Sequence, residues 1–306
     1  MLDVKKFESI VDFFDYIAPW NNSSMEGFIF RGHSREDYKL IPNVLRLENI
    51  EKIWMYVNGG NFKREQSDFL NLQVNAEFQL LREFYKLADM QGLSVPIANT
   101  FRKNLAQTFD MFGSINLEHR SIWLPEDLRE AAALAQHYGI PTRLLDWTYD
   151  PYVALYFALK GVIDEPQNIV IWALNKDHIS FLHPTVNRIN VEFITPHYFS
   201  NPNINAQKGI FTLCPVEKLS LREETKLMAE GKVQLVNRIP LDEFILSEAK
   251  DERVTFMKKF IIPIENYKDG LRILERMGYS TSRLFPGYDG VAKQILERNE
   301  HTKNRV

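Results

Sequence analysis

The sequence predicts an α+β fold, in which a small mixed sheet is flanked by helices and carries a helical insertion. Short apolar or β-branched runs bounded by polar residues, such as 168–174 and 206–213, are typical of buried strands. Apolar residues recur at helical spacing in other segments, among them 4–19 and 268–277. No linker, repeat or low-complexity tract divides the 306 residues, so we expect one domain over 1–306.

The same patterns predict the remaining elements along the chain. The expected strands cover 27–33, 168–174, 191–195, 206–213 and 254–264, and the expected helices cover 4–19, two or three segments within 47–110, a segment from 125 to 137, a segment after 150, 268–277 and the C-terminal end. The intervals 117–124 and 196–205 are expected to be loops. The core would therefore comprise 27–46 and 125–290, and about 47–115 would form the helical insertion.

Composition and charge narrow the class of protein. The 45% of apolar residues can form a substantial core, and a net charge of -3 with a pI near 6.2 shows no overall bias toward nucleic acid. Cys214 is the one cysteine, which excludes an internal disulfide and a cysteine-rich zinc site. The N-terminus lacks the apolar region of a signal peptide, and no stretch approaches the roughly 20 apolar residues that span a bilayer. We expect a cytoplasmic protein with no membrane contact.

Polar and titratable side chains are concentrated in the block from Leu134 to Ala158. A helix is expected to end at Gly139, with Pro141 after it, and Asp150-Pro151 fits the start of the next helix. A mere connection between two helices would not need the polar groups that lie between them. These groups are His137, Thr142, Arg143, Asp146 and Thr148.

Arg31 ends the short strand at 27–33 and precedes a turn that Gly32 permits. An arginine at a strand end can be held by the fold and still reach a ligand. Its structural alternative is an ion pair with Asp146 or with a nearby glutamate, and the spacing alone leaves both readings open.

Several motifs together resemble the FRG domain family, named for its Phe-Arg-Gly motif. They are Phe30-Arg31-Gly32 with His33, the block from Leu134 to Thr148, Pro151 with Ala154 to Ala158, the run from Asn205 to Thr212, and Leu284 to Gly290. The resemblance covers roughly 27–290 and identifies the chain as a single FRG-type domain. The family occurs mostly in bacteria and their phages and is uncharacterised in its chemistry. Membership implies, at the family level only, a role in phage defence or as a toxin.

A weaker resemblance, in the order of the elements, is to ADP-ribosyltransferases, which implies an ADP-ribosyltransferase-like architecture and NAD as the ligand. In that family a strand arginine contacts the NAD phosphates or ribose, and a later acid steadies the ribosyl cation. Carried over, Arg31 would contact the phosphates, Thr148 and Tyr156 would line the nicotinamide side, and Gln207 would stand where the acid belongs. A glutamine cannot supply the negative charge. Either Asp146 supplies it, or the site binds a nucleotide without transfer.

The polar block and the resemblance together give a set of expected catalytic residues and a set of expected NAD-binding residues. The expected catalytic residues are Arg31, His137, Asp146 and Gln207, and the expected NAD-binding residues are Arg31, Arg143, Thr148 and Tyr156. No metal is expected, and the acceptor, whether protein or nucleic acid, stays open. We further predict that Arg31, His137, Arg143, Asp146 and Gln207 share one pocket, because all five lie at the ends of elements.

Each of these residues also has a structural reading. His137 can interact with the carboxyl end of its helix, and Arg143 and Asp146, three residues apart, can form a buried ion pair. Thr148 can cap a helix, and Tyr156 can belong to the core. The sequence leaves these readings open beside the functional ones.

Two other classes of function remain open as well. One is a nuclease or another hydrolase that uses His137, His33 and Asp146. The sequence lacks close carboxylate pairs, His-x-His or Glu-x-x-His metal spacing and a Gly-x-Ser-x-Gly elbow, which speaks against that class. The other is a non-catalytic sensor module that binds a nucleotide or a protein.

Overall fold

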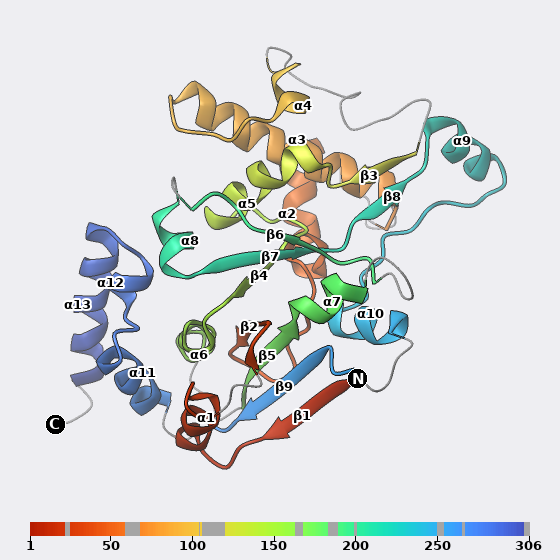
Figure 1. The fold of residues 1–306 in the computed structure, drawn as a ribbon. Helices are drawn as coiled ribbons and strands as arrows, with labels where there is room; N and C mark the ends of the chain where they lie inside the picture. Colours follow the sequence, from red (N-terminus) through yellow and green to blue (C-terminus); the bar gives the residue numbers. More distant parts are fainter. Residues whose placement is uncertain are drawn as a thin grey trace.

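A seven-stranded sheet forms the centre of the part of the chain that the structure describes (Figure 1). The computed structural model describes residues 1–21, 25–58, 68–103, 105, 120–162, 168–182, 189–198, 201–249, 254–264 and 267–302. The sheet order is β1-β9-β5-β2-β4-β7-β6. Its strands are Leu2–Lys6 (β1), Phe28–His33 (β2), Leu145–Thr148 (β4), Ile169–Asn175 (β5), Glu192–Ile194 (β6), Gly209–Leu213 (β7) and Met257–Ile262 (β9).

The sheet is mixed, as the sequence predicts. β1 lies parallel to β9, and the other neighbouring strands pair antiparallel. A separate two-stranded ribbon joins β3 (Ser121–Trp123) to β8 (Val216–Lys218). The prediction of an α+β fold with helices flanking a mixed sheet is therefore confirmed, although the sheet is larger than expected.

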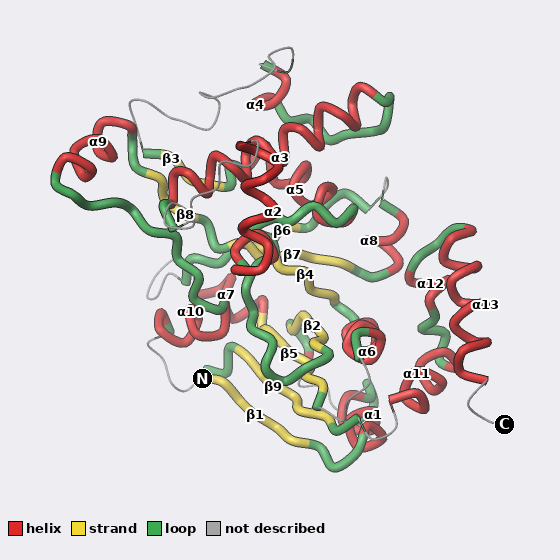
Figure 2. Tube along the Cα trace, turned by 180° about the vertical axis from the view of Figure 1, so that it is seen from behind, coloured by secondary structure: helices red, strands yellow, loops and turns green. Residues whose placement is uncertain are grey.

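Helices gather in groups around this sheet, and the views from front and back agree on their arrangement (Figures 1 and 2). One group comprises α1 (Ile10–Ile17), α6 (Pro151–Lys160), α11 (Tyr267–Arg276), α12 (Thr281–Leu284) and α13 (Tyr288–Thr302). A second comprises α2 (Leu47–Asn58), α3 (Leu70–Met90), α4 (Asn99–Arg102) and α5 (Arg129–His137), with the 3-10 turns Asn43–Leu45 and Glu126–Leu128. The remaining helices are α7 (Lys176–Leu182), α8 (Pro202–Ala206), α9 (Leu221–Ala229) and α10 (Leu241–Glu248).

Two apolar clusters cover one face of the sheet, and a third covers the other. Phe30 of β2 packs with α1 and α6 in the first cluster, whereas Phe211 of β7 packs with α3 and α5 in the second. Trp147 of β4 belongs to the third cluster, on the opposite face, because successive side chains of a strand alternate. Asp146 and Thr148 alternate with Trp147, so they point to the face where the first two clusters meet.

Some elements differ from the sequence-based expectation. Residues 2–6 form an edge strand rather than the start of a helix, because β9, some 250 positions later, pairs with them. The intervals 117–124 and 196–205, expected to be loops, contain β3 and α8 in their described parts. Gln207 caps the C-terminus of α8 and does not open a strand, since β7 begins at Gly209. Within the predicted insertion at 47–115, residues 59–67, 104 and 106–115 lie outside the described residues.

Candidate functional site

A cavity of about 330 Å³ opens where the two apolar clusters on one face of the sheet meet. We call it the Asp146 pocket. It is lined by Phe30, Arg31, Gly32, Gln136, His137, Asp146, Trp147, Thr148, Val153, Ala154, Phe157, Ile204, Gln207, Gly209, Phe211 and Phe285. Apolar walls with a few convergent polar groups are typical of small-molecule sites, whose volumes run from about 300 to 1,000 Å³.

Arg31 enters the pocket at the place where β2 and β4 separate. These two strands pair at Phe30 and Thr148. Beyond that pair, Arg31 Nη1 donates to the main-chain oxygen of Asp146 at 2.7 Å and lies 3.4 Å from Asp146 Oδ2. The guanidinium thus replaces the next backbone contact between the two strands, and Arg31 has a structural role whatever else it binds.

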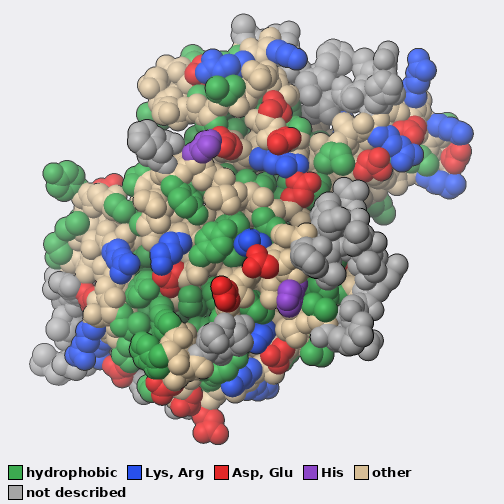
Figure 3. All heavy atoms as spheres, viewed as in Figure 1, with side chains coloured by type: hydrophobic (Ala, Val, Ile, Leu, Met, Phe, Trp, Pro, Cys, Tyr) green, Lys and Arg blue, Asp and Glu red, His purple; other side chains and the backbone are tan. Residues whose placement is uncertain are grey.

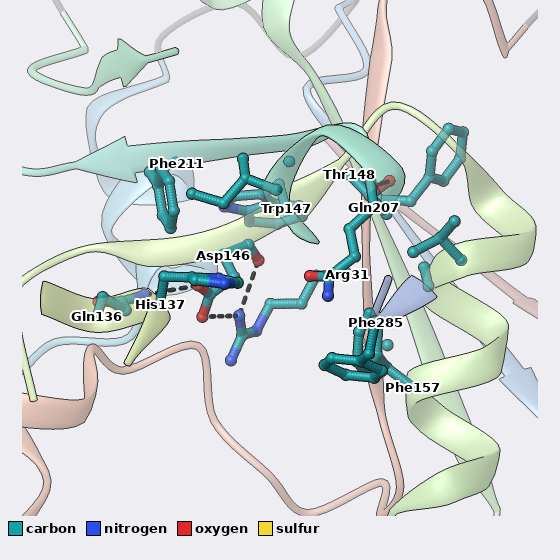
Figure 4. Close-up of a pocket in the computed structure, with 16 residues that line it drawn as sticks. Arg31, Gln136, His137, Asp146, Trp147, Thr148, Phe157, Gln207, Phe211 and Phe285 are labelled. Atoms are coloured by element: carbon teal, nitrogen blue, oxygen red, sulfur yellow. Dashed lines mark hydrogen bonds and ion pairs between the residues drawn. The ribbon is translucent and has the colours of Figure 1, made fainter. Parts of the chain in front are cut away.

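One terminal nitrogen of Arg31, Nη2, has no hydrogen-bond partner among the described residues. Nη1 contacts Asp146 and Nε donates to His33 Nε2 at 3.1 Å, whereas Nη2 makes no hydrogen bond to a described residue. Figure 4 shows this nitrogen turned away from the carboxylate. Burial lowers the pKa of Arg31 from the ordinary value of a guanidinium, and the charge of Asp146 opposes that shift. The free nitrogen is therefore a charged donor with no described protein acceptor.

Asp146 presents its carboxylate to the cavity from β4. Gln136 Nε2 donates to Oδ1 at 2.7 Å, and Arg31 contacts Oδ2. The hydroxyl of Thr142 in turn donates to the amide oxygen of Gln136, which fixes the orientation of that amide. The side chain of Asp146 is nevertheless 60% exposed, so two donors hold the carboxylate while one side of it stays open to a ligand.

Two histidines near the pocket are neutral at neutral pH. Burial, together with the charge of Arg31, lowers the pKa of His33 to about 3, and its Nε2 accepts the hydrogen bond from Arg31. Burial also lowers the pKa of His137, and Asp146 opposes that shift. His137 Nε2 lies 3.1 Å from the amide nitrogen of Asn203, which donates to it when the imidazole proton is on Nδ1.

Thr148 and Gln207 close the pocket on the side of α6 and α12. Thr148 Oγ1 donates to the main-chain oxygen of Gln207 at 2.7 Å and accepts from the backbone nitrogen of Asp150 at 3.0 Å. Gln207 Nε2 donates to the main-chain oxygen of Leu284 at 3.0 Å. Both side chains therefore support the walls. Thr148 holds the turn before α6, but the cap of that helix is Asp150 and not Thr148.

Figure 4 places five of the predicted residues around one cavity, although they come from four separate stretches of the chain: Arg31, His137, Asp146, Thr148 and Gln207. Their roles as catalytic or NAD-binding residues stay predictions.

Residues 26–166 match the FRG domain family. The chain carries an FRG domain. Neither a curated protein nor a solved structure matches the chain. The matched range holds β2, α5, β4 and α6, which supply most of the pocket, whereas Gln207, Phe211 and Phe285 lie beyond it.

The three residues that name the FRG domain have three separate physical roles here. Phe30 is 3% exposed and packs in the apolar cluster under α6. Arg31 joins β2 to β4 and reaches the cavity. At Gly32 a Cβ atom would lie 1.9 Å from the main-chain oxygen of Ala154, so only glycine lets α6 approach the strand this closely. The motif therefore builds the wall of the pocket.

Arg143, which we expected in the same pocket, lies behind its wall. Its Nε donates to Glu77 Oε2 of α3 at 2.6 Å, and both side chains are almost fully buried. The predicted ion pair between Arg143 and Asp146 is wrong, because strand alternation and the turn at Thr142 direct the two side chains to different partners. The ion pair with Glu77 therefore links the segment between α5 and β4 to α3.

Glu77 is the centre of a buried polar network that the sequence did not reveal. Its Oε2 also accepts from Trp123 Nε1 at 2.6 Å, and its Oε1 accepts from Gln73 Nε2 at 2.9 Å. We call Glu77, Arg143, Trp123 and Gln73 the Glu77 network. The charged helical pattern around residue 77 gave no sign of a buried acid, whose partner lies 66 positions away in the sequence.

Tyr156 also lies outside the Asp146 pocket, on another side of α6. Its hydroxyl hydrogen-bonds Thr281 Oγ1 at 2.7 Å, and burial raises its pKa to about 12. Thr281 donates to Glu297 of α13, which pairs with Lys160 of α6 at 2.6 Å. Tyr156 is 4% exposed and belongs to the core, as its structural reading predicts. Its hydroxyl also links α6 to the C-terminal helices.

Gln136 and Phe285 are pocket residues that the sequence-based analysis missed. The amide of Gln136 does not titrate, so nothing in the sequence marks it as a site residue. Its role comes from the hydrogen bond to Asp146, which β4 places beside it. Phe285 approaches Phe157 edge to face, with ring centroids 6.1 Å apart, from a segment more than 120 positions away. Neither contact has a local sequence signature.

Neither a metal-binding cluster nor a membrane-spanning helix occurs in the described part of the chain. No group of three or more His, Cys, Asp or Glu side chains there is placed to hold a metal ion. No described helix combines the length and apolar character needed to cross a membrane. On the face shown in Figure 3, acidic and basic side chains are interspersed, and neither sign dominates.

Proposed function

We propose that the Asp146 pocket binds NAD and that Asp146 promotes cleavage of the bond between nicotinamide and ribose. The observation that carries this proposal is a carboxylate that two donors hold in place and that remains 60% exposed toward an apolar-walled cavity. A fixed negative charge beside a sugar stabilises the positive charge that develops when such a bond breaks.

The proposed step balances without another reactant. The bond between ribose C1′ and the nicotinamide nitrogen breaks, and its electron pair goes to the ring, which loses its positive charge and leaves. The carboxylate of Asp146 stabilises the ribosyl cation. A nucleophile, either water or an acceptor group, then forms the new bond to C1′ and gives up a proton. His137 is neutral at neutral pH and is the pocket group suited to take that proton.

The walls support a ligand with a flat ring and a charged tail. Phe157 and Phe285 form an aromatic wall on the side opposite to Gln136, and Arg31, which also lines the cavity, offers Nη2 as a charged donor. A cavity of about 330 Å³ accommodates a ring and its sugar but not the whole of NAD. The phosphates and the adenosine would therefore extend from the mouth of the pocket.

In this proposal Asp146 supplies the negative charge that stabilises the ribosyl cation, because the neutral amide of Gln207 cannot supply it. The Gln207 amide is held by the main-chain oxygen of Leu284, so it is oriented to contact a neutral group such as a ribose hydroxyl. Arg31 partly compensates the charge of Asp146, which favours a modest rate. Consumption of NAD would agree with the role in defence or toxicity that the family resemblance implies.

A paired measurement of nicotinamide release and NAD binding tests the proposal. Asp146→Asn should keep the shape of the pocket but lose one of the two hydrogen bonds to the side chain, because Gln136 and Arg31 both donate and an amide has a single oxygen. The rate of nicotinamide release should fall by roughly 10²–10³-fold, the scale of one preorganised electrostatic contact. The variant's free energy of unfolding should change by less than about 1 kcal/mol, because the pair with Arg31 is largely exposed on the aspartate side.

Asp37→Asn is the matched control. Asp37 also pairs with an arginine, at 2.9 Å, and is 64% exposed, but it lies outside the pocket. This variant should release nicotinamide at the wild-type rate. Binding of NAD without release in the wild type would support the non-catalytic nucleotide sensor instead, and the absence of NAD binding would remove both readings.

A further inference from the structure

We propose that the outer face of α13 binds the same face of a second copy of this chain, with the two helices antiparallel around Ala292. This pairing is independent of the proposed function. No residue of α13 is among those that line the Asp146 pocket, and the association of two copies is measured without a nucleotide.

The side of α13 that faces the rest of the chain is polar. Gln294 Nε2 donates to Glu275 of α11 at 2.8 Å, and Glu297 pairs with Lys160 of α6 at 2.6 Å. Gly290 lies on the same side, because a Cβ atom there would meet a main-chain oxygen of the segment before the helix at 1.9 Å. A hydrogen bond, an ion pair and a close backbone contact therefore hold α13 by its polar side.

The opposite side of α13 is apolar, and it is exposed to solvent. We call its five exposed residues the α13 stripe: Tyr288, Val291, Ala292, Ile295 and Leu296. Tyr288 is 95% exposed and Leu296 is 66% exposed. A helix on the surface of a single chain normally turns its apolar side to the core and its polar side to water. In α13 this orientation is reversed, and the helix lies at the edge of the molecule (Figure 1), so the stripe is placed to contact another surface.

The size of the side chains along the stripe suits an antiparallel pair. Tyr288, Ala292 and Leu296 are four residues apart, so they form one row along the helix, with the small residue in the middle. When a two-fold axis passes through Ala292, Tyr288 covers Leu296 of the second copy, and Leu296 covers Tyr288 of the second copy. Alanine in the centre allows the two helices to approach closely. The row is therefore complementary to itself.

The residues beside this row determine the direction of the pair. Val291 and Ile295 lie on one side of the row, and the exposed Asp289 and Lys293 lie on the other. Antiparallel helices bring equal sides together, so the apolar sides meet and Asp289 faces Lys293 of the second copy. A parallel pair would set the apolar side against the charges. Neither charge forms an ion pair with a residue that the structure describes, so both are available to a second copy.

Sedimentation velocity of the full chain, without nucleotide, tests this pairing. The average mass should rise from the 35.9 kDa of one chain toward twice that value as the concentration increases. A helix of 15 residues is about 22 Å long. One such pair is a small contact, so we expect the rise at micromolar concentrations. Leu296→Glu should raise the dissociation constant by at least about tenfold, because it places a charge against Tyr288 of the second copy.

Leu47→Glu is the matched control. Leu47 is 67% exposed, nearly the same as Leu296, but it begins α2, which belongs to the other group of helices. This variant adds the same charge to the chain and should associate like the wild type. The replaced side chains are exposed, so each variant should keep the circular dichroism spectrum of the wild type.

A charge exchange tests the antiparallel direction. Asp289→Lys and Lys293→Asp each set two equal charges opposite one another in the pair, and each should raise the dissociation constant by about fivefold or more, since an exposed pair is weak but occurs twice. The double variant, with Asp289→Lys and Lys293→Asp together, restores opposite charges and should associate more tightly than either single variant.

Three results would overturn the proposal. A chain that keeps the mass of one copy at every concentration does not pair through α13, and the stripe would then bind a different partner or none. Equal association of the wild type and Leu296→Glu would mean that two copies meet through another surface. A double charge variant that associates no better than the single variants would exclude the antiparallel pair.

Discussion

Replacement of Glu77 by glutamine should destabilise the fold strongly, although Glu77 does not line the Asp146 pocket. Glu77 is 3% exposed, and its two oxygens accept hydrogen bonds from Arg143, Trp123 and Gln73. All three partners are donors. A glutamine offers a single oxygen, so at least one of these donors would face an amide nitrogen, and the buried charge of Arg143 would lose its counterion.

The two effects set the magnitude. Breaking a buried pair by removing one partner costs about 3–5 kcal/mol, and an orphaned buried donor adds about 1–3 kcal/mol. We therefore expect a loss of at least about 4 kcal/mol in the free energy of unfolding for Glu77→Gln. At roughly 2–4 °C per kcal/mol, the melting temperature should fall by about 8 °C or more.

Urea unfolding followed by circular dichroism measures this loss, and Glu217→Gln is the control. Glu217 pairs with Arg120, but both side chains are more than half exposed, so its replacement should cost less than about 1 kcal/mol. A loss of less than about 1 kcal/mol in Glu77→Gln as well would refute the reasoning, because Arg143 would then have another way to satisfy its charge.

Two further predictions concern the Phe-Arg-Gly strand. Gly32→Ala should lose about 3 kcal/mol or more, because its Cβ would meet the main-chain oxygen of Ala154 at 1.9 Å, and a melting temperature equal to that of the wild type would contradict this packing. Burial lowers the pKa of His33 from the ordinary value of 6.5 to about 3. Between these two pH values the unfolded state binds a proton at His33 and the folded state does not. The free energy of unfolding therefore falls as the pH is lowered from 6.5 toward 3. Between roughly pH 7 and pH 4 the free energy of unfolding of the wild type should therefore fall by on the order of 3 kcal/mol more than that of His33→Gln. The amide oxygen of this variant can still accept the hydrogen bond from Arg31. Equal losses in the two proteins, measured by unfolding at each pH, would show that the pKa of His33 is not lowered.

The sequence predicted those helices and strands whose ends are set by capping or turn residues next to them in the chain. Asp150 caps α6 through the backbone nitrogen of Tyr152 at 3.0 Å, with Pro151 in the first turn, and Gly139 ends α5 with a φ of 86°. The strand at 28–33 was predicted for the same reason, since apolar residues alternate up to a glycine. Such features depend on neighbouring residues and can be read without the fold.

Features that depend on distant partners could not be predicted in this way. Residues 2–6 alternate like an exposed edge strand, and β9, their neighbour among the described strands, lies about 250 positions later in the chain. Arg143 had a sequence neighbour, Asp146, that looked like its partner, but the turn at Thr142 separates the two and Glu77 takes that place. The pocket was predicted as a meeting point of element ends, whereas its aromatic wall depends on Phe285, which arrives from the C-terminal helices.

The proposal that the Asp146 pocket is a nucleotide site can be tested by a calorimetric titration with NAD. Wild type and Arg31→Lys are compared at a temperature where circular dichroism shows both to be folded. We expect the wild type to bind one NAD per chain and Arg31→Lys to bind it more weakly by about 1.5–3 kcal/mol, because lysine keeps the charge but loses the forked donor geometry. Equal affinity in the two proteins, or no binding in the wild type, would contradict the claim.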